Sequence, residues 1–142
     1  MRRNPHPDSY VLVVDDHDLL RETLGEVLED FGYEVRLAAD GAEALRCLDQ
    51  DPNCGLMLLD REIAPLGAEN IVSRVRADSG RRAVPVVLLS AQIDPCGQAS
   101  SPVCEGHLAK PIALAELLAT LDTFASKRRC GIGNHRIEER VI

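Results

Sequence analysis

Short apolar runs alternate with stretches of helical periodicity along most of this chain, and this alternation restricts the possible fold more than any other feature. The runs that we interpret as strands lie at residues 10–14, 34–39, 56–60, 84–90 and 106–110. Apolar residues at i, i+3 and i+4 spacing predict helices at 20–31, 41–51, 68–79 and 114–124. Gly32 should end the first helix, and Asp40 with Glu43 three residues later is a capping-box-like start for the second. Alternation of strands and helices is typical of an α/β protein whose parallel sheet is covered by helices on both faces.

Composition excludes several functional classes. The 142 residues, 45% of them hydrophobic, suffice for one domain with a core of its own. A net charge of −7 argues against general nucleic-acid binding, because contact with phosphates needs a basic surface. No apolar run is long enough to span a membrane, and the start of the chain lacks the apolar segment of a signal peptide. We therefore expect a cytoplasmic protein without membrane contact.

Two segments interrupt the alternating pattern. Residues 92–106 contain Pro95, Gly97 and Pro102, which disfavour a helix interior, so we expect an irregular or short fourth helix there. The last residues are polar with scattered apolar positions. We expect one domain over residues 9–127 and a C-terminal tail or linker over 128–142. The chain could also be a fragment of a longer protein.

The five cysteines form no CxxC pair, and their odd number indicates no disulfide framework. Cys96, Cys104 and His107 lie close together in the sequence and could contribute to a metal site. Ordinary loop and core thiols are the simpler interpretation.

Polar residues follow the predicted strands, at the edge where parallel sheets bind ligands. Asp15 and Asp16 follow the first strand, Asp60 ends the third, Ser90 the fourth and Lys110 the fifth. Three close carboxylates repel one another, and Mg²⁺, which prefers oxygen ligands, would relieve that repulsion. A lysine ammonium and a serine hydroxyl suit phosphoryl oxygens. A carboxylate in this setting can act as a nucleophile that accepts a phosphoryl group.

Each of these residues alone has an ordinary explanation. An acidic pair after a strand often caps a helix, and a lone Asp or Ser often forms a turn. Lysine, however, is scarce in this chain: only Lys110 and Lys127 occur among 16 basic residues. The five residues together, in this order on alternating elements, indicate one site.

This set of residues resembles the receiver domain of two-component response regulators. The matching motifs are VLVVDDHD, LMLLD, VVLLSA and AKP, within a resemblance that covers residues 9–127. The resemblance implies a flavodoxin-like, doubly wound, five-stranded parallel sheet of order 2-1-3-4-5. It also implies a phosphoacceptor protein, not an enzyme with a separate substrate. Because no second domain follows in the sequence, we expect a stand-alone receiver. Its partners would be a sensor histidine kinase or histidine phosphotransfer protein and a downstream protein target, with no nucleic acid.

The resemblance also implies roles for single residues. Asp60 resembles the phosphorylated aspartate, and Asp15 and Asp16 resemble the acidic pair that binds Mg²⁺. The family adds Asp60 itself and the backbone carbonyl of Glu62 as metal ligands. Glu62 and Gln92 occupy positions that flank the attacking water in the family and tune the lifetime of the phosphoryl group.

Three further residues correspond to moving or pairing groups of the family. Ser90 resembles the switch hydroxyl, and Lys110 resembles the lysine that pairs with the phosphoryl group. The Lys110–Pro111 peptide is expected to be cis, because proline lowers the free-energy cost of the cis isomer. His107 takes the place of the switch aromatic and could rotate between states or respond to pH. An edge histidine without any switching role is an equally good interpretation.

The sequence departs from the family after Asp60. Ile63 and Ala64 replace the usual Met-Pro, Pro65 comes one residue late and Ala68 takes the place of a glycine. We therefore expect a loop of different shape beside the site. This departure leaves open a pseudo-receiver, an interaction module that is not phosphorylated.

A phosphatase resembling the haloacid-dehalogenase family is the other alternative. Asp16-His17-Asp18 after an apolar run matches a DxD signature, and Ser90 and Lys110 could supply its next two motifs. That family also needs a late acidic pair at a strand end. Such a pair is missing from the predicted strand ends of this chain, and Asp60 would have no role.

Overall fold

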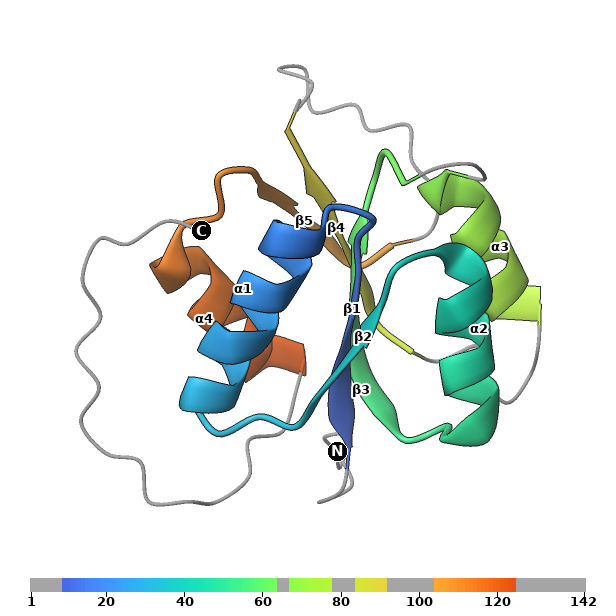
Figure 1. Cartoon of the computed structure of the whole chain (residues 1–142), viewed down its shortest axis with the longest axis horizontal. Coiled ribbons are helices and arrows are strands. Elements are labelled where there is room, and N and C mark those ends of the chain that lie inside the picture. The colour runs from blue at the N-terminus through green and yellow to red at the C-terminus, as the bar shows by residue number, and fades with distance from the viewer. Residues whose placement is uncertain (1–8, 64–66, 78–83, 92–103, 125–142) are drawn as a thin grey trace.

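A five-stranded parallel sheet lies between two pairs of helices in the computed structural model, which describes residues 9–63, 67–77, 84–91 and 104–124 (Figure 1). The strands are β1 (Tyr10–Val14), β2 (Val35–Ala38), β3 (Cys54–Asp60), β4 (Val86–Ser90) and β5 (Gly106–Ala109). Their order in the sheet is β2-β1-β3-β4-β5, and every neighbouring pair is parallel. This order confirms the predicted flavodoxin-like sheet.

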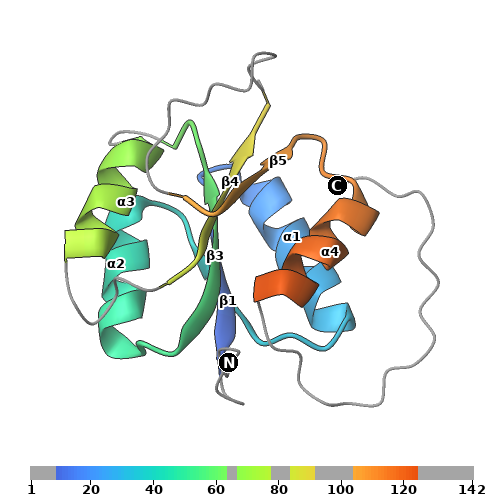
Figure 2. The same cartoon turned by 180° about the vertical axis from the view of Figure 1, so that it is seen from behind.

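Among the described residues, two helices cover each face of the sheet. The helices are α1 (Asp18–Asp30), α2 (Gly41–Gln50), α3 (Ala68–Ala77) and α4 (Leu114–Phe124). Helices α1 and α4 lie on one face, and α2 and α3 lie on the other, as the front and back views show (Figures 1 and 2). None of the described helices has both the length and the apolar character that crossing a bilayer requires.

The buried side chains form two separate cores because the strands are covered on both faces. One core joins alternate residues of β1 and β3 to Leu24 and Leu28 of α1 and to Leu117 and Leu121 of α4. The other joins the remaining strand residues to side chains of α2 and α3, among them Ala44, Leu48, Ile71, Val72 and Val75. All of β1 and β4 is buried, which is why these strands are continuous apolar runs and do not alternate with polar residues.

Several predicted element boundaries needed correction. Strand β3 begins at Cys54, two residues before the predicted run, while β2, β4 and β5 are shorter than predicted. Helix α1 begins at Asp18 and not at Leu20. His17 caps this helix, since its Nδ1 accepts a hydrogen bond from the Leu20 N–H at 3.3 Å. Apolar periodicity begins only where a helix meets the core, so it missed the first turn.

The predicted helix caps are present. Asp40 caps α2 by accepting a hydrogen bond from the Glu43 N–H at 2.8 Å. The Glu43 carboxylate in turn accepts from the Ala39 N–H at 2.8 Å, a variant of the capping box. Gly32 ends α1 with a φ of 93°, a conformation that glycine adopts without a steric penalty. The predicted irregular fourth helix and the predicted tail over 128–142 lie outside the described residues.

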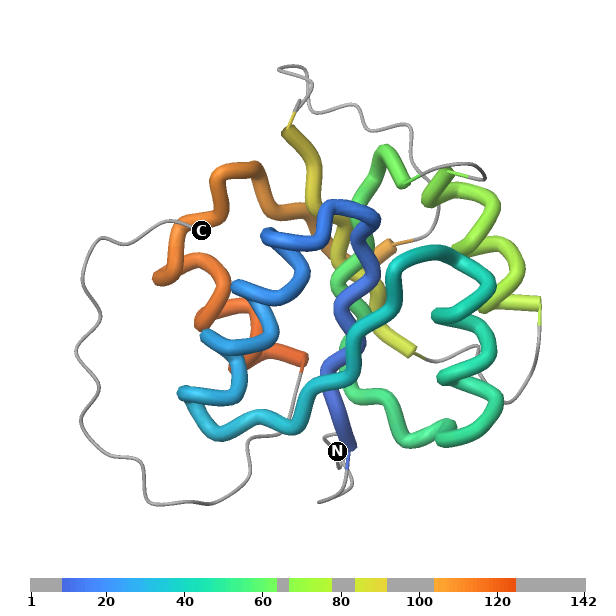
Figure 3. Tube along the Cα trace, in the orientation of Figure 1, coloured from blue at the N-terminus to red at the C-terminus, as the bar shows by residue number. Residues whose placement is uncertain are grey.

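The chain path explains where a site should form. From β1 the chain passes through α1 to β2 at one side of β1, and β3 pairs with the other side of β1 (Figure 3). The sheet order therefore reverses at β1 and β3. In open sheets of this kind, ligands bind at that point, beyond the carboxyl ends of the strands.

Candidate functional site

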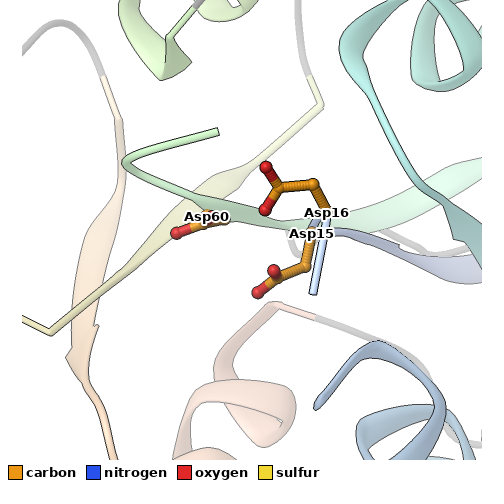
Figure 4. Close-up of side chains that lie close together, drawn as sticks. All are labelled: Asp15, Asp16 and Asp60. Carbon is orange, nitrogen blue, oxygen red and sulfur yellow. The ribbon is translucent and has the colours of Figure 1, made fainter. Parts of the chain in front are cut away.

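Three aspartates converge at the carboxyl ends of β1 and β3. Asp15 and Asp16 directly follow β1, and Asp60 is the last residue of β3 (Figure 4). Each contributes a carboxylate oxygen to a group whose members all lie within 4.8 Å of one another. Asp15 is fully buried and Asp60 is 5% exposed, whereas Asp16 is exposed. The structure therefore brings together the acidic residues that the sequence placed on separate strands.

Lys110 neutralises part of this charge. Its Nζ donates hydrogen bonds to Asp15 Oδ2 and to Asp60 Oδ1, each at 3.2 Å. The Lys110 N–H also donates to the Ser90 carbonyl at 2.9 Å, which ties the end of β5 to the end of β4. The Lys110–Pro111 peptide is cis, as expected.

The protonation of these groups reflects their surroundings. Burial, and next the negative charge of Asp15, raise the pKa of Asp60 above its usual value, although Lys110 acts in the opposite direction. Burial by itself would lower the pKa of Lys110, but the carboxylates of Asp15 and Asp60 outweigh it, so that pKa is raised. Lys110 is therefore a fixed cation at neutral pH. The ionised form of Asp60 is less favourable in the folded protein than it would be in water.

A cavity of about 460 Å³ opens above these residues. Its lining consists of Asp15, Asp16, His17, Leu20, Asp60, Glu62 and Lys110. The sequence predicted the acidic residues, the lysine and Glu62 at this site but missed the other two. His17 and Leu20 belong to the first turn of α1 and its cap, which directly follow the acidic pair. Their position next to that pair was the signal that could have identified them.

Arg21 is a further residue that the sequence interpretation missed. Its Nη1 donates a hydrogen bond to the Asp15 carbonyl at 2.8 Å, and its Nη2 pairs with Asp18 at 2.7 Å. The His17 N–H donates to Asp15 Oδ1 at 2.9 Å. These contacts fix the turn between β1 and α1, and so they hold the acidic pair in place.

Ser90 and Glu62 contact each other at the rear of the site. Ser90 is fully buried, and its Oγ donates a hydrogen bond to Glu62 Oε2 at 3.2 Å. The Glu62 N–H donates to Asp60 Oδ1 at 3.3 Å. Ser90 is thus next to the site, as predicted, but the structure couples it to the Glu62 side chain, for which the sequence analysis gave no contact.

His107 lies apart from the cavity. It is exposed on β5, and its Nε2 is 3.8 Å from the Cys104 Sγ. Its switching role remains a prediction. Cys96, the third member of the alternative metal site, lies outside the described residues, and so do Gln92, Ala64 and Pro65.

The phosphatase alternative receives no support from the geometry. It requires both acids of the Asp16-His17-Asp18 stretch in one site. The Asp18 side chain is 79% exposed, pairs with Arg21 and does not line the cavity. Asp60, which that alternative leaves without a role, lies at the centre of the site.

The donor set fits Mg²⁺. Carboxylate oxygens are hard ligands, and Mg²⁺ characteristically binds one or two carboxylates while it keeps open positions for water or phosphate. Three aspartates against one lysine give the site an excess of acidic groups, which a divalent cation would balance.

Comparison with known proteins gives a consistent result. Residues 11–122 match a family model described as the response regulator receiver domain. The chain is 32% identical over 126 residues to the sensory/regulatory protein RpfC of Xanthomonas campestris, across 84% of this chain and 17% of RpfC. It therefore spans about a sixth of that relative.

Two solved structures are similar to most of this chain. The chemotaxis response regulator CheY4 of Vibrio cholerae is 31% identical with a TM-score of 0.72, covering 81% of this chain and 97% of CheY4. The response regulator TrrA of Thermotoga maritima, solved in complex with Mg²⁺-BeF, is 28% identical with a TM-score of 0.71, covering 81% and 97% of the two chains.

Proposed function

Because this chain belongs to the response regulator receiver family, we propose that its Asp60 accepts a phosphoryl group from a sensor histidine kinase or a histidine phosphotransfer protein, in a reaction that depends on Mg²⁺. The observation that carries this proposal is the convergence of Asp60, Asp15, Asp16 and Lys110 at one edge of one sheet. The Mg²⁺-BeF complex of TrrA supports the same chemistry by analogy.

Asp60 is the nucleophile in the proposed reaction. One of its carboxylate oxygens attacks the phosphorus atom while the bond between phosphorus and the donor nitrogen breaks, and the donor histidine leaves with that bonding pair. The product is an acyl phosphate on Asp60. Attack by water later releases inorganic phosphate and restores the carboxylate, so the chain is a phosphoacceptor and not an enzyme with a separate substrate.

The remaining residues stabilise the charge that moves with the phosphoryl group. The carboxylates of Asp15, Asp16 and Asp60 and the backbone carbonyl of Glu62 would hold Mg²⁺. When bound, that ion supplies positive charge against the phosphoryl oxygens. Lys110 already contacts Asp60, so its ammonium can pair with an oxygen of a group attached there.

Ser90 and His107 would transmit the change to the rest of the domain. We assign Ser90 the switch hydroxyl, which donates to a phosphoryl oxygen after transfer. His107, exposed on β5, would change its rotamer between states. We take residues 9–127 as the receiver domain and 128–142 as its tail.

The signal would pass through protein–protein contacts in the cytoplasm, because the donor kinase needs the ATP that this compartment contains. RpfC, named a sensory/regulatory protein, contains a segment similar to this chain, which supports a sensor kinase or relay protein as the donor. The acidic net charge of −7 supports a protein target and not nucleic acid.

The test is phosphorylation by acetyl phosphate, followed by intact-mass spectrometry. We expect a phosphoryl adduct on the wild-type protein in Mg²⁺ and none after the metal is chelated. Asp60→Asn, which keeps the shape of the side chain but removes the nucleophile, should give no adduct. If the wild-type protein binds Mg²⁺ but forms no adduct with acetyl phosphate or a histidine phosphotransfer protein, a pseudo-receiver is the better description.

A further inference from the structure

Glu62 contacts both the proposed phosphoacceptor and the proposed switch hydroxyl. Its backbone N–H donates to Asp60 Oδ1 at 3.3 Å, and its carboxylate oxygen Oε2 accepts the hydrogen bond of the Ser90 hydroxyl at 3.2 Å. Ser90 is fully buried, so this bond lies away from bulk solvent on the serine side. One residue of the loop after β3 therefore bridges the ends of β3 and β4.

The hydroxyl of Ser90 cannot serve two acceptors at once. A serine hydroxyl has one proton to donate, and here Glu62 receives it. A phosphoryl group on Asp60 would need the same proton. The Glu62 carboxylate and the phosphoryl group are thus competitors for a single donor.

Charge adds to this competition. Glu62 is the fourth carboxylate among the described residues that line the cavity, and Lys110 is the one lysine or arginine in that lining. An acyl phosphate on Asp60 carries roughly −1.5 to −2 at neutral pH, as a phosphomonoester does, where the free carboxylate carried −1, so phosphorylation makes the site more negative by up to about one charge. The Glu62 carboxylate therefore repels the group that the site is built to receive.

We propose that the Glu62 carboxylate is an autoinhibitory contact: it holds the Ser90 hydroxyl in the unphosphorylated protein and must release it when Asp60 is phosphorylated. This inference rests on the proposed function. It makes Glu62 a positioning residue that acts through the Ser90 hydroxyl. This role is distinct from any effect of Glu62 on the water that hydrolyses the phosphoryl group.

Equilibrium binding of beryllofluoride in the presence of Mg²⁺ tests the inference. Its beryllium becomes tetrahedral when an aspartate oxygen coordinates it, so the adduct resembles a phosphoryl group but does not hydrolyse as one. Glu62→Ala should bind it about 10-fold more tightly than the wild-type protein, the size expected when one competing hydrogen bond is lost. Glu62→Gln, which loses the charge but keeps an oxygen that can accept the hydroxyl proton, should fall between the two.

A double-mutant cycle with Ser90→Ala separates the hydrogen bond from the charge. Without the hydroxyl there is nothing for Glu62 to hold, so Glu62→Ala should gain clearly less affinity in the Ser90→Ala background than in the wild type. Glu29→Gln is the matched control, because it removes one negative charge near the far end of α1 and should leave the affinity unchanged. Urea unfolding of each variant checks that it is folded.

The outcomes are distinct. The inference is overturned if both Glu62 variants bind beryllofluoride no more tightly than the wild type, or if the gain is the same with and without the Ser90 hydroxyl. If the wild-type protein and Glu29→Gln themselves neither bind beryllofluoride nor form an adduct with acetyl phosphate, the proposed function fails, and the inference fails with it.

Discussion

At the scale of single residues, the Asp60 carboxylate is suited to the proposed chemistry but lowers the stability of the fold. Its carboxylate is buried, and its pKa is raised by that burial and by the neighbouring Asp15. A raised pKa in the folded state means that the folded protein favours the neutral form more than the unfolded chain does. At neutral pH the ionised Asp60 therefore destabilises the fold when no metal ion is bound.

Asp60→Asn should accordingly stabilise the metal-free protein. We expect the free energy of unfolding at neutral pH to rise by about 1 kcal/mol, because the variant removes a buried charge while keeping its volume. The advantage should shrink as the pH falls through the raised pKa and vanish below the ordinary value of 3.8, where Asp60 is protonated in both states. Urea denaturation across pH measures this difference. A less stable Asn variant at neutral pH would show that the ionised carboxylate is net favourable.

Substitution of Lys110 should have the opposite effect and lower the free energy of unfolding. Lys110→Met removes the ammonium that contacts Asp15 and Asp60, and Asp15 has no exposed surface. We expect a loss of about 2 kcal/mol in the absence of metal, less than for a fully buried pair because the Lys110 side chain is 20% exposed. Mg²⁺ should restore part of this loss.

Arg46→Met, on the exposed face of α2, is the control for the loss of one positive charge. If it destabilised the protein as much as Lys110→Met does, the contacts with the two aspartates would not explain the effect.

Single residues also differ in whether their contacts can be predicted from the sequence. Acidic residues and a lysine at strand ends could be assigned to one site, because the carboxyl ends of parallel strands meet at one edge. The contact between Ser90 and Glu62 could not, since the two lie 28 residues apart and their pairing depends on side-chain conformation. The Arg21 contact with the Asp15 carbonyl joins residues that are close in the sequence, but it too depends on side-chain conformation and was missed.

At the scale of secondary-structure elements, local signals in the sequence set most boundaries. The Asp40 cap and the Gly32 stop were predicted because they depend on backbone groups only a few residues away. The start of α1 was predicted too late, because a histidine is not among the preferred capping residues. The early start of β3 was missed because Cys54 and Gly55 precede the continuous apolar run.

The α2 cap gives a prediction at this scale. Asp40→Ala should lower the free energy of unfolding by about 1 kcal/mol, since the Glu43 N–H loses its acceptor. Asp40→Asn should retain most of the stability, because its amide oxygen can accept the same bond. Thermal unfolding of the two variants measures this difference. Acetyl phosphate should still modify the alanine variant, because Asp40 does not line the cavity. Equal loss in both variants would mean that the charge and not the hydrogen bond matters.

At the scale of the whole molecule, the sheet order explains how the site is assembled. Alternating strands and helices predicted a parallel sheet, but the order β2-β1-β3-β4-β5 was implied by the family resemblance and not by the pattern itself. That order places β1 and β3 side by side, and so it brings Asp15 and Asp16 to Asp60. The two helical layers complete the cores on either face and leave this edge open as a cavity.

The central claim is that Asp60 is the residue that carries the phosphoryl group. The most direct measurement is borohydride reduction of the protein after reaction with acetyl phosphate in Mg²⁺, which converts an acyl-phosphorylated aspartate to homoserine, followed by peptide mass mapping. We predict homoserine at position 60 and intact aspartate at positions 15 and 16. Homoserine at either of the other two aspartates, or at none of the three in a protein that binds Mg²⁺, would contradict the account.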